Sequence, residues 1–347
     1  MDNFGDISGV KLNPLKTKAL WLGPCRHRHD KPFRFQWPEK PIPVLGTFIS
    51  YNEKENEKYN FTLKLQKLKT ILDIWNCRSL TLFGRCLIAK SLGISQLIHS
   101  ISSLDVPLEY LNAVNSAIFK FIWKNKKDKI KRKVMFLDYD QGGLRAPSIY
   151  VLSKSLKLAW ISRLLADEHN SGESWKAIPN YFFERFGGLN FILRCNYDKK
   201  FLDQIGLPQF YKLILLYFLE LKEPSPYQSS QEQILFNNKD ILIHGRSIFY
   251  RNWYDRGVYL VHDLLKTDGN FLSYSEFIQK YDLRCNFLIN FQVVSAIPRH
   301  FVENARANPT DKSDLLLNSM FQFSPEISLN LTKTKNRSEE RRVGKEC

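Results

Sequence analysis

The sequence predicts a predominantly helical α+β protein with a small β region near its N-terminus. Two observations carry this prediction. Before residue 52, aromatic and β-branched residues alternate with polar ones, which is typical of strands. From about residue 60 onward, apolar residues recur three or four positions apart, which is the spacing of a helix face.

The first 59 residues are expected to form the β region. Phe33, Phe35 and Trp37 alternate with polar residues, and the run VLGTFISY (Val44–Tyr51) is rich in β-forming residues. Three prolines lie between these two runs and predict the turn that connects them.

Residues 60–169 are expected to form a helical bundle. The first apolar face recurs at helical spacing at Phe61, Leu65, Leu68, Leu72 and Trp75. The second follows Pro107, a plausible first helical residue, at Leu108, Leu111, Val114, Ile118 and Ile122. A third helix is expected over residues 148–166.

The rest of the chain is also expected to be mainly helical. Residues 170–222 form a helical extension, and residues 223–233 (EPSPYQSSQEQ) have the composition of a linker. Residues 234–330 form a C-terminal region in which Ser273–Phe277 offers a Ser-x-x-Glu capping box. Residues 337–347 are polar and unpatterned and resemble an artefactual, vector-derived tail, so the fold prediction omits them.

Composition and charge point to a globular chain that binds a polyanion. The chain has 347 residues, of which 44% are hydrophobic, and 51 basic against 35 acidic side chains leave a net charge of +16. Nucleic acid is the polyanion that such a charge favours. No apolar run of membrane-spanning length occurs, so we expect no membrane partner and an intracellular, cytoplasmic or nuclear location. The six cysteines are scattered and contain no CxxC pair, which favours reduced thiols.

One ten-residue segment concentrates the charge. The segment KNKKDKIKRK carries seven basic residues against Asp128, and it is the main candidate for contacts with phosphates. Its candidate residues are Lys124, Lys126, Lys127, Lys129, Lys131, Arg132 and Lys133. A second basic stretch at the start of the helical region adds Lys64 and Lys67. The alternative is a solvated loop without a ligand.

Three further groups of residues have side chains that could take part in metal binding or base stacking. Asp138 and Asp140 would share one face of a strand and could hold a metal, but the glycines that follow favour a surface turn. The sequence CRHRH (Cys25–His29) has zinc-ligand residue types in one short loop, and loop histidines are the simpler interpretation. The aromatic run from Phe119 to Trp123 continues an amphipathic helix and is expected to be core rather than a base-stacking surface.

Several phrases, taken in order, resemble the downstream half of a reverse transcriptase from a LINE-type non-LTR retrotransposon. Each is weak alone, and their collinear order is specific. They are GVKLN and KTKALWLG (within 8–23), IPVLGTFIS (42–50), WNCRSLTLFGRCLIAKSLGISQL (75–97), FKFIWKNKKDKIKR followed by GGLRAPS (142–148), and GRSIFYRNWYDRGVYLVHDLL (245–265).

The resemblance implies that residues 1–59 are a palm remnant and residues 60–169 a thumb-like bundle. In that family the first phrase follows the catalytic Tyr-x-Asp-Asp box, which this sequence does not contain. We therefore expect a fragment truncated before that box, with no catalytic or metal-binding residues of its own, and inactive alone as an RNA-directed DNA polymerase. Mg²⁺ is the cofactor expected for the complete family enzyme.

The same resemblance implies partners and further site residues. RNA or RNA–DNA hybrid would be bound by backbone and shape, because a thumb follows the template–primer duplex. Lys16 corresponds to a lysine near the nucleotide, and Gly46 to a close approach of the primer strand, with a simple bulge as the alternative for Gly46. Two other functions remain open: a non-catalytic nucleic-acid-binding module, and an incomplete retroelement product without a selected function. The sequence gives no indication of the oligomeric state.

Overall fold

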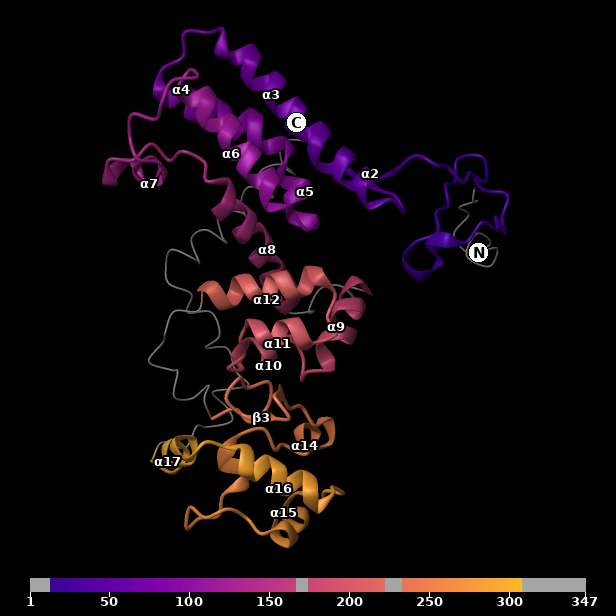
Figure 1. Ribbon diagram of the computed structural model, residues 1–347, viewed down its shortest axis with the longest axis vertical. Helices are drawn as coiled ribbons and strands as arrows, with labels where there is room; N and C mark the ends of the chain where they lie inside the picture. Colours follow the sequence, from indigo (N-terminus) through magenta and orange to yellow (C-terminus); the bar gives the residue numbers. More distant parts are fainter. Residues whose placement is uncertain (1–12, 167–173, 222–232, 308–347) are drawn as a thin grey trace. The chain divides into compact units, whose positions relative to one another are not determined.

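The computed structural model describes residues 13–166, 174–221 and 233–307 (Figure 1). The chain divides into two compact units, here called the upstream unit (Met1–Ser153) and the downstream unit (Lys154–Cys347). Most of the described elements are helical, together with two short antiparallel strand pairs, which confirms the predicted, predominantly helical α+β class. The tail expected at 337–347 lies outside the described residues.

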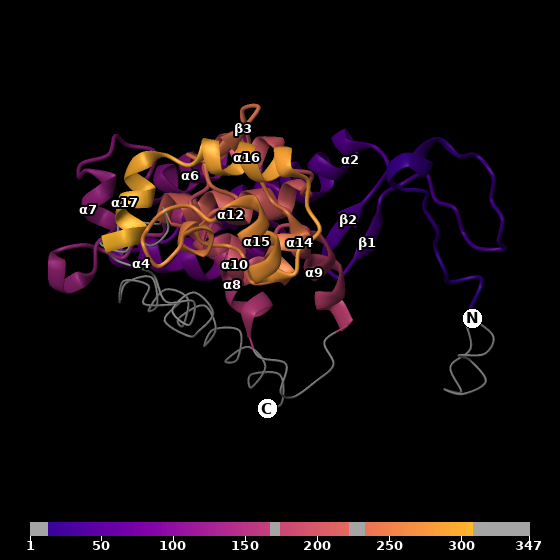
Figure 2. The same ribbon diagram turned by 90° about the horizontal axis from the view of Figure 1, so that it is seen from below.

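The β region of the upstream unit is a single hairpin. Strands β1 (Ile42–Val44) and β2 (Thr47–Ile49) pair antiparallel (Figure 2). The turn residues between them, Leu45 and Gly46, have φ angles of 46° and 86°. A two-residue hairpin turn of the I′ type requires positive φ at both positions. The turn therefore falls inside the run that the sequence predicted to be one strand.

The other predicted strand, Phe33–Trp37, does not form. Its pairing is limited to one isolated bridge between Gln36 and Lys18, beside a short 3-10 turn at Gly23–His27. The prediction of a strand there was wrong, because alternation alone does not supply a partner for the backbone. The prolines that follow remove N–H donors from any longer ladder.

Two asparagine side chains fasten the hairpin to the helix that follows it. Asn60 accepts the N–H of Phe48 at 2.8 Å and donates to the Phe48 carbonyl at 2.7 Å. Asn56, in helix α2 (Glu53–Glu57), does the same for Ser50, at 2.6 and 2.9 Å. A π-helical turn at Lys58–Thr62 carries Asn60 and continues into the first long helix. Side chains therefore satisfy both hydrogen-bonding groups of Phe48 and of Ser50.

The body of the upstream unit consists of helices that pack around α6 (Figure 1). Its main helices are α3 (Leu63–Asn76), α4 (Leu82–Ile88), α5 (Ile98–Ser103) and α6 (Leu108–Ile122). A π-helical turn (Ala89–Gly93) and a 3-10 turn (Ile94–Gln96) join α4 to α5.

Both predicted apolar faces lie in this core. The buried members are Phe61, Leu68, Leu72, Leu111, Val114, Ile118 and Ile122. Leu108 is an exception, because it is the first helical residue after the N-cap Pro107 and is 65% exposed. The sequence predicted Pro107 as the first helical residue. In the structure it is the N-cap, and the helix begins one residue later.

After α6 the chain forms helix α7 (Arg132–Phe136), a 3-10 turn (Tyr139–Gln141) and a tight return. Backbone N–H groups of Leu144 and Ala146 both donate to the carbonyl of Met135, at 3.2 and 2.8 Å. Within this return, a Cβ on Gly143 would lie 2.0 Å from the carbonyl oxygen of Leu137. Only glycine fits there.

The downstream unit contains twelve of the described elements after helix α8 (Ile149–Leu165), which begins before the division between the units. They are a 3-10 turn (Ser174–Lys176), α9 (Ala177–Glu184), α10 (Leu189–Arg194), α11 (Lys199–Gln204), α12 (Gln209–Leu221), β3 (Leu242–Ile243), β4 (Arg246–Ser247), α14 (Arg251–Asp255), a second 3-10 turn (Val261–Leu264), α15 (Tyr274–Tyr281), α16 (Phe287–Ala296) and α17 (Arg299–Ala307). The capping box predicted at Ser273 is present, because Ser273 accepts from Glu276 N and Glu276 accepts from Ser273 N.

One core joins the two sides of the segment predicted to be a linker. Phe183 and Ile192 precede that segment, Trp253 and Phe301 follow it, and all four belong to one buried cluster. The predicted boundary at 223–233 therefore does not separate two cores, although residues 223–232 lie outside the described part. The Pro/Ser/Gln-rich composition indicates a connecting segment. It does not indicate whether the segments before and after it share one core. None of the described helices is both long enough and apolar enough to cross a membrane.

Candidate nucleic-acid interface

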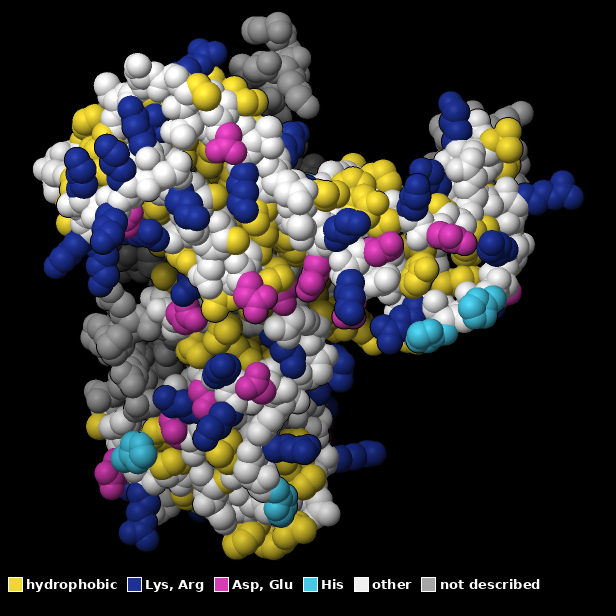
Figure 3. All heavy atoms as spheres, turned by 45° about the horizontal axis from the view of Figure 1, so that its top comes forward, with side chains coloured by type: hydrophobic (Ala, Val, Ile, Leu, Met, Phe, Trp, Pro, Cys, Tyr) yellow, Lys and Arg dark blue, Asp and Glu magenta, His cyan; other side chains and the backbone are white. Residues whose placement is uncertain are grey.

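Positive charge is concentrated in the upstream unit. Residues 1–153 carry 25 Lys and Arg against 13 Asp and Glu, which leaves +12 of the total net charge of +16. In Figure 3, Lys and Arg side chains are spread over the surface of this unit's helices, with fewer Asp and Glu among them. The unit therefore presents a surface that attracts polyanions.

The basic segment, defined as Lys124–Lys133, begins where α6 ends. Lys124 and Asn125 both have positive φ angles, 52° and 60°. The N–H of Asn125 donates to Lys120 O at 2.8 Å and that of Lys124 to Phe121 O at 3.2 Å, which is the hydrogen-bond pattern of a Schellman helix end. This cap satisfies the last carbonyls of α6 and turns the chain away from the helix axis.

A buried arginine braces the same helix end. Arg85 of α4 is 1% exposed and donates to Phe121 O at 2.7 Å and to Asn76 Oδ1 at 2.8 Å. Its guanidinium lies 5.0 Å from the centre of the Phe121 ring, and burial lowers its pKa. A cation at the C-terminal carbonyls of a helix is favourable. Arg85 thus holds the ends of α3 and α6 together and fixes the point where the basic segment starts.

The lysines of the basic segment face solvent. Six are exposed, and within the described residues none has an ion-pair partner: Lys124, Lys126, Lys127, Lys129, Lys131 and Lys133. The carboxylate of Asp128, the acidic residue of the segment, pairs with Arg132 Nε at 2.6 Å. The Arg132 guanidinium also lies 4.2 Å from the centre of the Phe119 ring. Arg132 therefore anchors α7, and the six lysines remain available to a ligand.

The aromatic run next to the segment belongs to the core. Phe119, Phe121 and Trp123 are 1%, 4% and 8% exposed. The prediction that these rings are core rather than a stacking surface is confirmed.

Lys64 and Lys67, equivalent by sequence, differ in the structure. The Lys64 ammonium donates to Gly46 O at 3.0 Å and to Ser100 Oγ, and burial, followed by repulsion from Lys67, lowers its pKa. Lys64 thus links the hairpin turn to α5. Lys67, nearly one turn further along α3, is exposed.

The structure places Gly46 in the hairpin turn, beside residues of its own unit. A Cβ on Gly46 would lie 3.1 Å from the His99 imidazole. Lys16 lies in an exposed turn whose backbone is held by Asn13: the side chain of Asn13 accepts the N–H of Leu15 at 3.1 Å and that of Lys16 at 3.3 Å. Gly46 and Lys64 are therefore brought into contact, and no hydrogen bond among the described residues joins Lys16 to either of them.

The acidic pair considered for metal binding forms a turn, as predicted. Asp138 precedes the 3-10 turn that contains Asp140, and its carboxylate pairs with Arg145 Nε at 2.5 Å. His27 accepts from Arg26 Nε in the loop at Gly23–His27. In the described part of the chain, no three His, Cys, Asp or Glu side chains gather in a group that could hold a metal ion.

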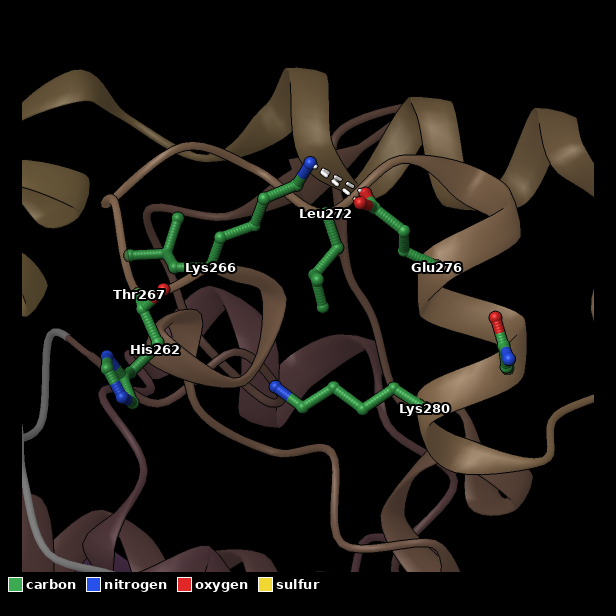
Figure 4. Close-up of a pocket in the computed structure, with 8 residues that line it drawn as sticks. His262, Lys266, Thr267, Leu272, Glu276 and Lys280 are labelled. Atoms are coloured by element: carbon green, nitrogen blue, oxygen red, sulfur yellow. Dashed lines mark hydrogen bonds and ion pairs between the residues drawn. The ribbon is translucent and has the colours of Figure 1, made fainter.

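The downstream unit has a pocket of about 470 Å³ near α15 (Figure 4). Lys266 and Glu276 form an ion pair at its edge, and this pair with the Ser273 hydrogen bonds lowers the pKa of Glu276 to about 2. Lys280 and His262 also line it, and the Lys280 ammonium lies 5.1 Å from the Tyr281 ring centre. The ion pair neutralises one cation, so this pocket concentrates less charge than the basic segment.

An exposed aromatic pair was missed at the sequence level. Phe83 of α4 and Tyr139 contact each other with ring centroids 5.7 Å apart. Phe83 lies within an ordinary helical pattern, and nothing in that pattern distinguishes an exposed ring from a core ring.

No known protein-family model matches this chain.

Proposed function

We propose that this chain is a downstream portion of a LINE-type non-LTR retrotransposon reverse transcriptase, and that its upstream unit binds RNA or RNA–DNA hybrid. In this proposal residues 1–59, with the hairpin, correspond to the end of the palm, and residues 60–169, with the basic segment, to the thumb. The collinear sequence phrases support the family. The six unpaired lysines at the capped end of α6 carry the binding function.

The charge arrangement favours a sequence-independent mode of binding. Lysine ammonium groups contact phosphates without reading bases, and each contact releases condensed counterions. An RNA–DNA hybrid offers a wide, shallow minor groove and regularly spaced phosphates. Arg85 and the helix cap fix the end of α6. The basic segment therefore begins at a fixed position on the helical bundle.

The proposal assigns no chemical step to this chain. Polymerisation in the family depends on metal ions held by carboxylates. The sequence lacks the Tyr-x-Asp-Asp box, and Asp138 is paired with Arg145. The contribution proposed for the described residues is to hold the template–primer.

The test is to neutralise the basic segment. A variant with Gln at Lys124, Lys126, Lys127, Lys129 and Lys131 should bind RNA and hybrid more weakly, and equally so for all base sequences. Each lost phosphate contact should flatten the plot of log K against log salt by about 0.7–0.9. Fluorescence anisotropy across a salt series measures both quantities.

A matched control removes the same number of charges from the downstream unit. Suitable exposed positions are Lys199, Lys200, Lys239, Arg246 and Arg284, all changed to Gln. If the control flattens the salt slope as much as the segment variant, net charge rather than the basic segment governs binding. An unchanged slope in the segment variant would remove the segment from the interface.

A further inference from the structure

Two aromatic rings on the upstream unit are exposed and in contact with each other. Phe83 is 56% exposed and Tyr139 is 54% exposed, and their ring planes are tilted by 42°. Leu87, one turn after Phe83 on α4, is 64% exposed. A contiguous apolar patch on a water-exposed surface is a common mark of a binding site.

The stretch of chain that contains Tyr139 is net positive, since residues 124–145 carry eight basic side chains against three acidic ones, two of which, Asp138 and Asp140, flank Tyr139 directly. The Arg145 guanidinium lies 5.0 Å from the centre of the Tyr139 ring, while the Arg145–Asp138 ion pair holds it in place. The basic segment ends at Lys133, within α7, six positions before Tyr139. An apolar surface on a net-positive stretch of chain suits a ligand that has flat apolar faces and negative charge.

We propose that the Phe83–Tyr139 ring pair stacks an unpaired base of a single-stranded RNA or DNA while the basic segment holds the adjacent phosphates. This inference rests on the proposed nucleic-acid binding and narrows its substrate to one with a single-stranded part. Within a duplex the base faces are covered by their neighbours, so exposed rings can stack only on unpaired or terminal bases. Stacking uses the π face that every base has, so the site is tolerant of sequence.

The alternative ligand for the exposed residues Phe83, Leu87 and Tyr139 is the surface of another protein. Charge favours nucleic acid, because the eight basic side chains against three acidic ones in residues 124–145 would face unfavourable desolvation against an apolar protein partner. The experiment below separates the two.

The experiment compares two probes with the full chain: a blunt RNA–DNA hybrid, and the same hybrid with a single-stranded RNA overhang. The double variant Phe83→Ala/Tyr139→Ala should weaken overhang binding about tenfold or more. Its affinity for the blunt hybrid should fall much less, because only the terminal base pairs of that probe expose a base face, and its salt slope should stay unchanged because no charge is lost. Tyr139→Trp should retain overhang binding, since it keeps a flat ring.

Tyr181→Ala is the matched control, because Tyr181 is an exposed ring (67%) on the downstream unit. This substitution should change neither the Kd for the blunt hybrid nor the Kd for the hybrid with the overhang. Circular dichroism and thermal melting of each variant check that the fold is retained, which we expect because the rings are exposed.

Three outcomes overturn this inference. Overhang affinity could be unchanged in the double variant, or both probes could weaken equally. The double variant could also lose self-association in sedimentation while keeping its overhang affinity, which would assign the rings to a protein contact. Failure of the underlying binding function looks different: the wild-type chain would then bind neither probe in a salt-dependent manner. If the wild type binds both probes and the lysine variant flattens the slope, a failed ring variant refutes only the stacking site.

Discussion

Substituting one of two adjacent glycines should destabilise the upstream unit much more than substituting the other. A Cβ on Gly143 would lie 2.0, 2.3 and 2.7 Å from the carbonyl oxygen, carbonyl carbon and Cα of Leu137. These are backbone atoms, which no side-chain rotation can move aside. In Gly143→Ala the return after α7 must therefore shift.

The magnitude follows from the hydrogen bonds that such a shift would break. The return is held by Gly143 N to Asp138 O at 2.8 Å, Arg145 N to Leu137 O at 3.0 Å and Ala146 N to Met135 O at 2.8 Å. At about 1 kcal/mol for each bond, their loss costs about 3 kcal/mol. Gly142 has a φ of +76° but open space around its Cβ position, so Gly142→Ala should cost only the left-handed strain, about 1–2 kcal/mol.

Thermal unfolding of the full chain, followed by hydrogen exchange, tests this difference. For a unit of this size, about 3 kcal/mol lowers the melting temperature of the upstream unit by about 6–12 °C. Gly143→Ala should also speed amide exchange of Leu144 and Ala146, whose N–H groups donate to Met135. If Gly143→Ala proves no more destabilising than Gly142→Ala, the close approach described here is wrong.

Two further predictions follow from the same unit. Arg85→Lys should destabilise the chain by about 1–3 kcal/mol in urea unfolding, because Nη1 donates both bonds, to Asn76 and to Phe121 O, and the lysine ammonium ends one bond short of that position. Wild-type stability in this variant would show that the two bonds are unimportant. Nucleotide incorporation on an RNA template with Mg²⁺ or Mn²⁺ should stay at background, because the sequence lacks the Tyr-x-Asp-Asp box; incorporation that Asp138→Asn with Asp140→Asn abolishes would refute this.

Helix faces could be predicted from the sequence because burial leaves a periodic trace. The positions from Leu111 to Ile122 on α6 recur at helical spacing and are buried as expected. The same reasoning fails at the ends of elements, where Leu108 matches the period but is exposed. Periodicity identifies a face of a helix, and it does not say how far the covering elements extend along it.

The candidate site could be predicted only in part. The sequence shows which residues are charged, but it does not show which groups those residues contact in the fold. Lys64 and Lys67 look alike in the sequence, yet the Lys64 ammonium donates a hydrogen bond to the Gly46 carbonyl and Lys67 faces solvent. Phe83 and Tyr139 lie 56 positions apart, so no local pattern could pair them. Arg85 looks like a surface cation in the sequence, and its burial depends on carbonyl and amide groups from two other helices.

The asparagine clamps on the hairpin also determine how this part of the chain meets other strands. In a hairpin with a two-residue turn, Phe48 and its partner Pro43 point their backbone polar groups outward. On the β2 side, Asn60 already occupies both groups of Phe48, and on the β1 side Pro43 has no N–H to offer. Neither edge presents a free donor–acceptor pair at this position, so the hairpin resists edge-to-edge aggregation. A strand added beside Phe48 would have to displace Asn60, and one added beside Pro43 would find no N–H donor, so the hairpin is a poor template for a larger sheet at this position.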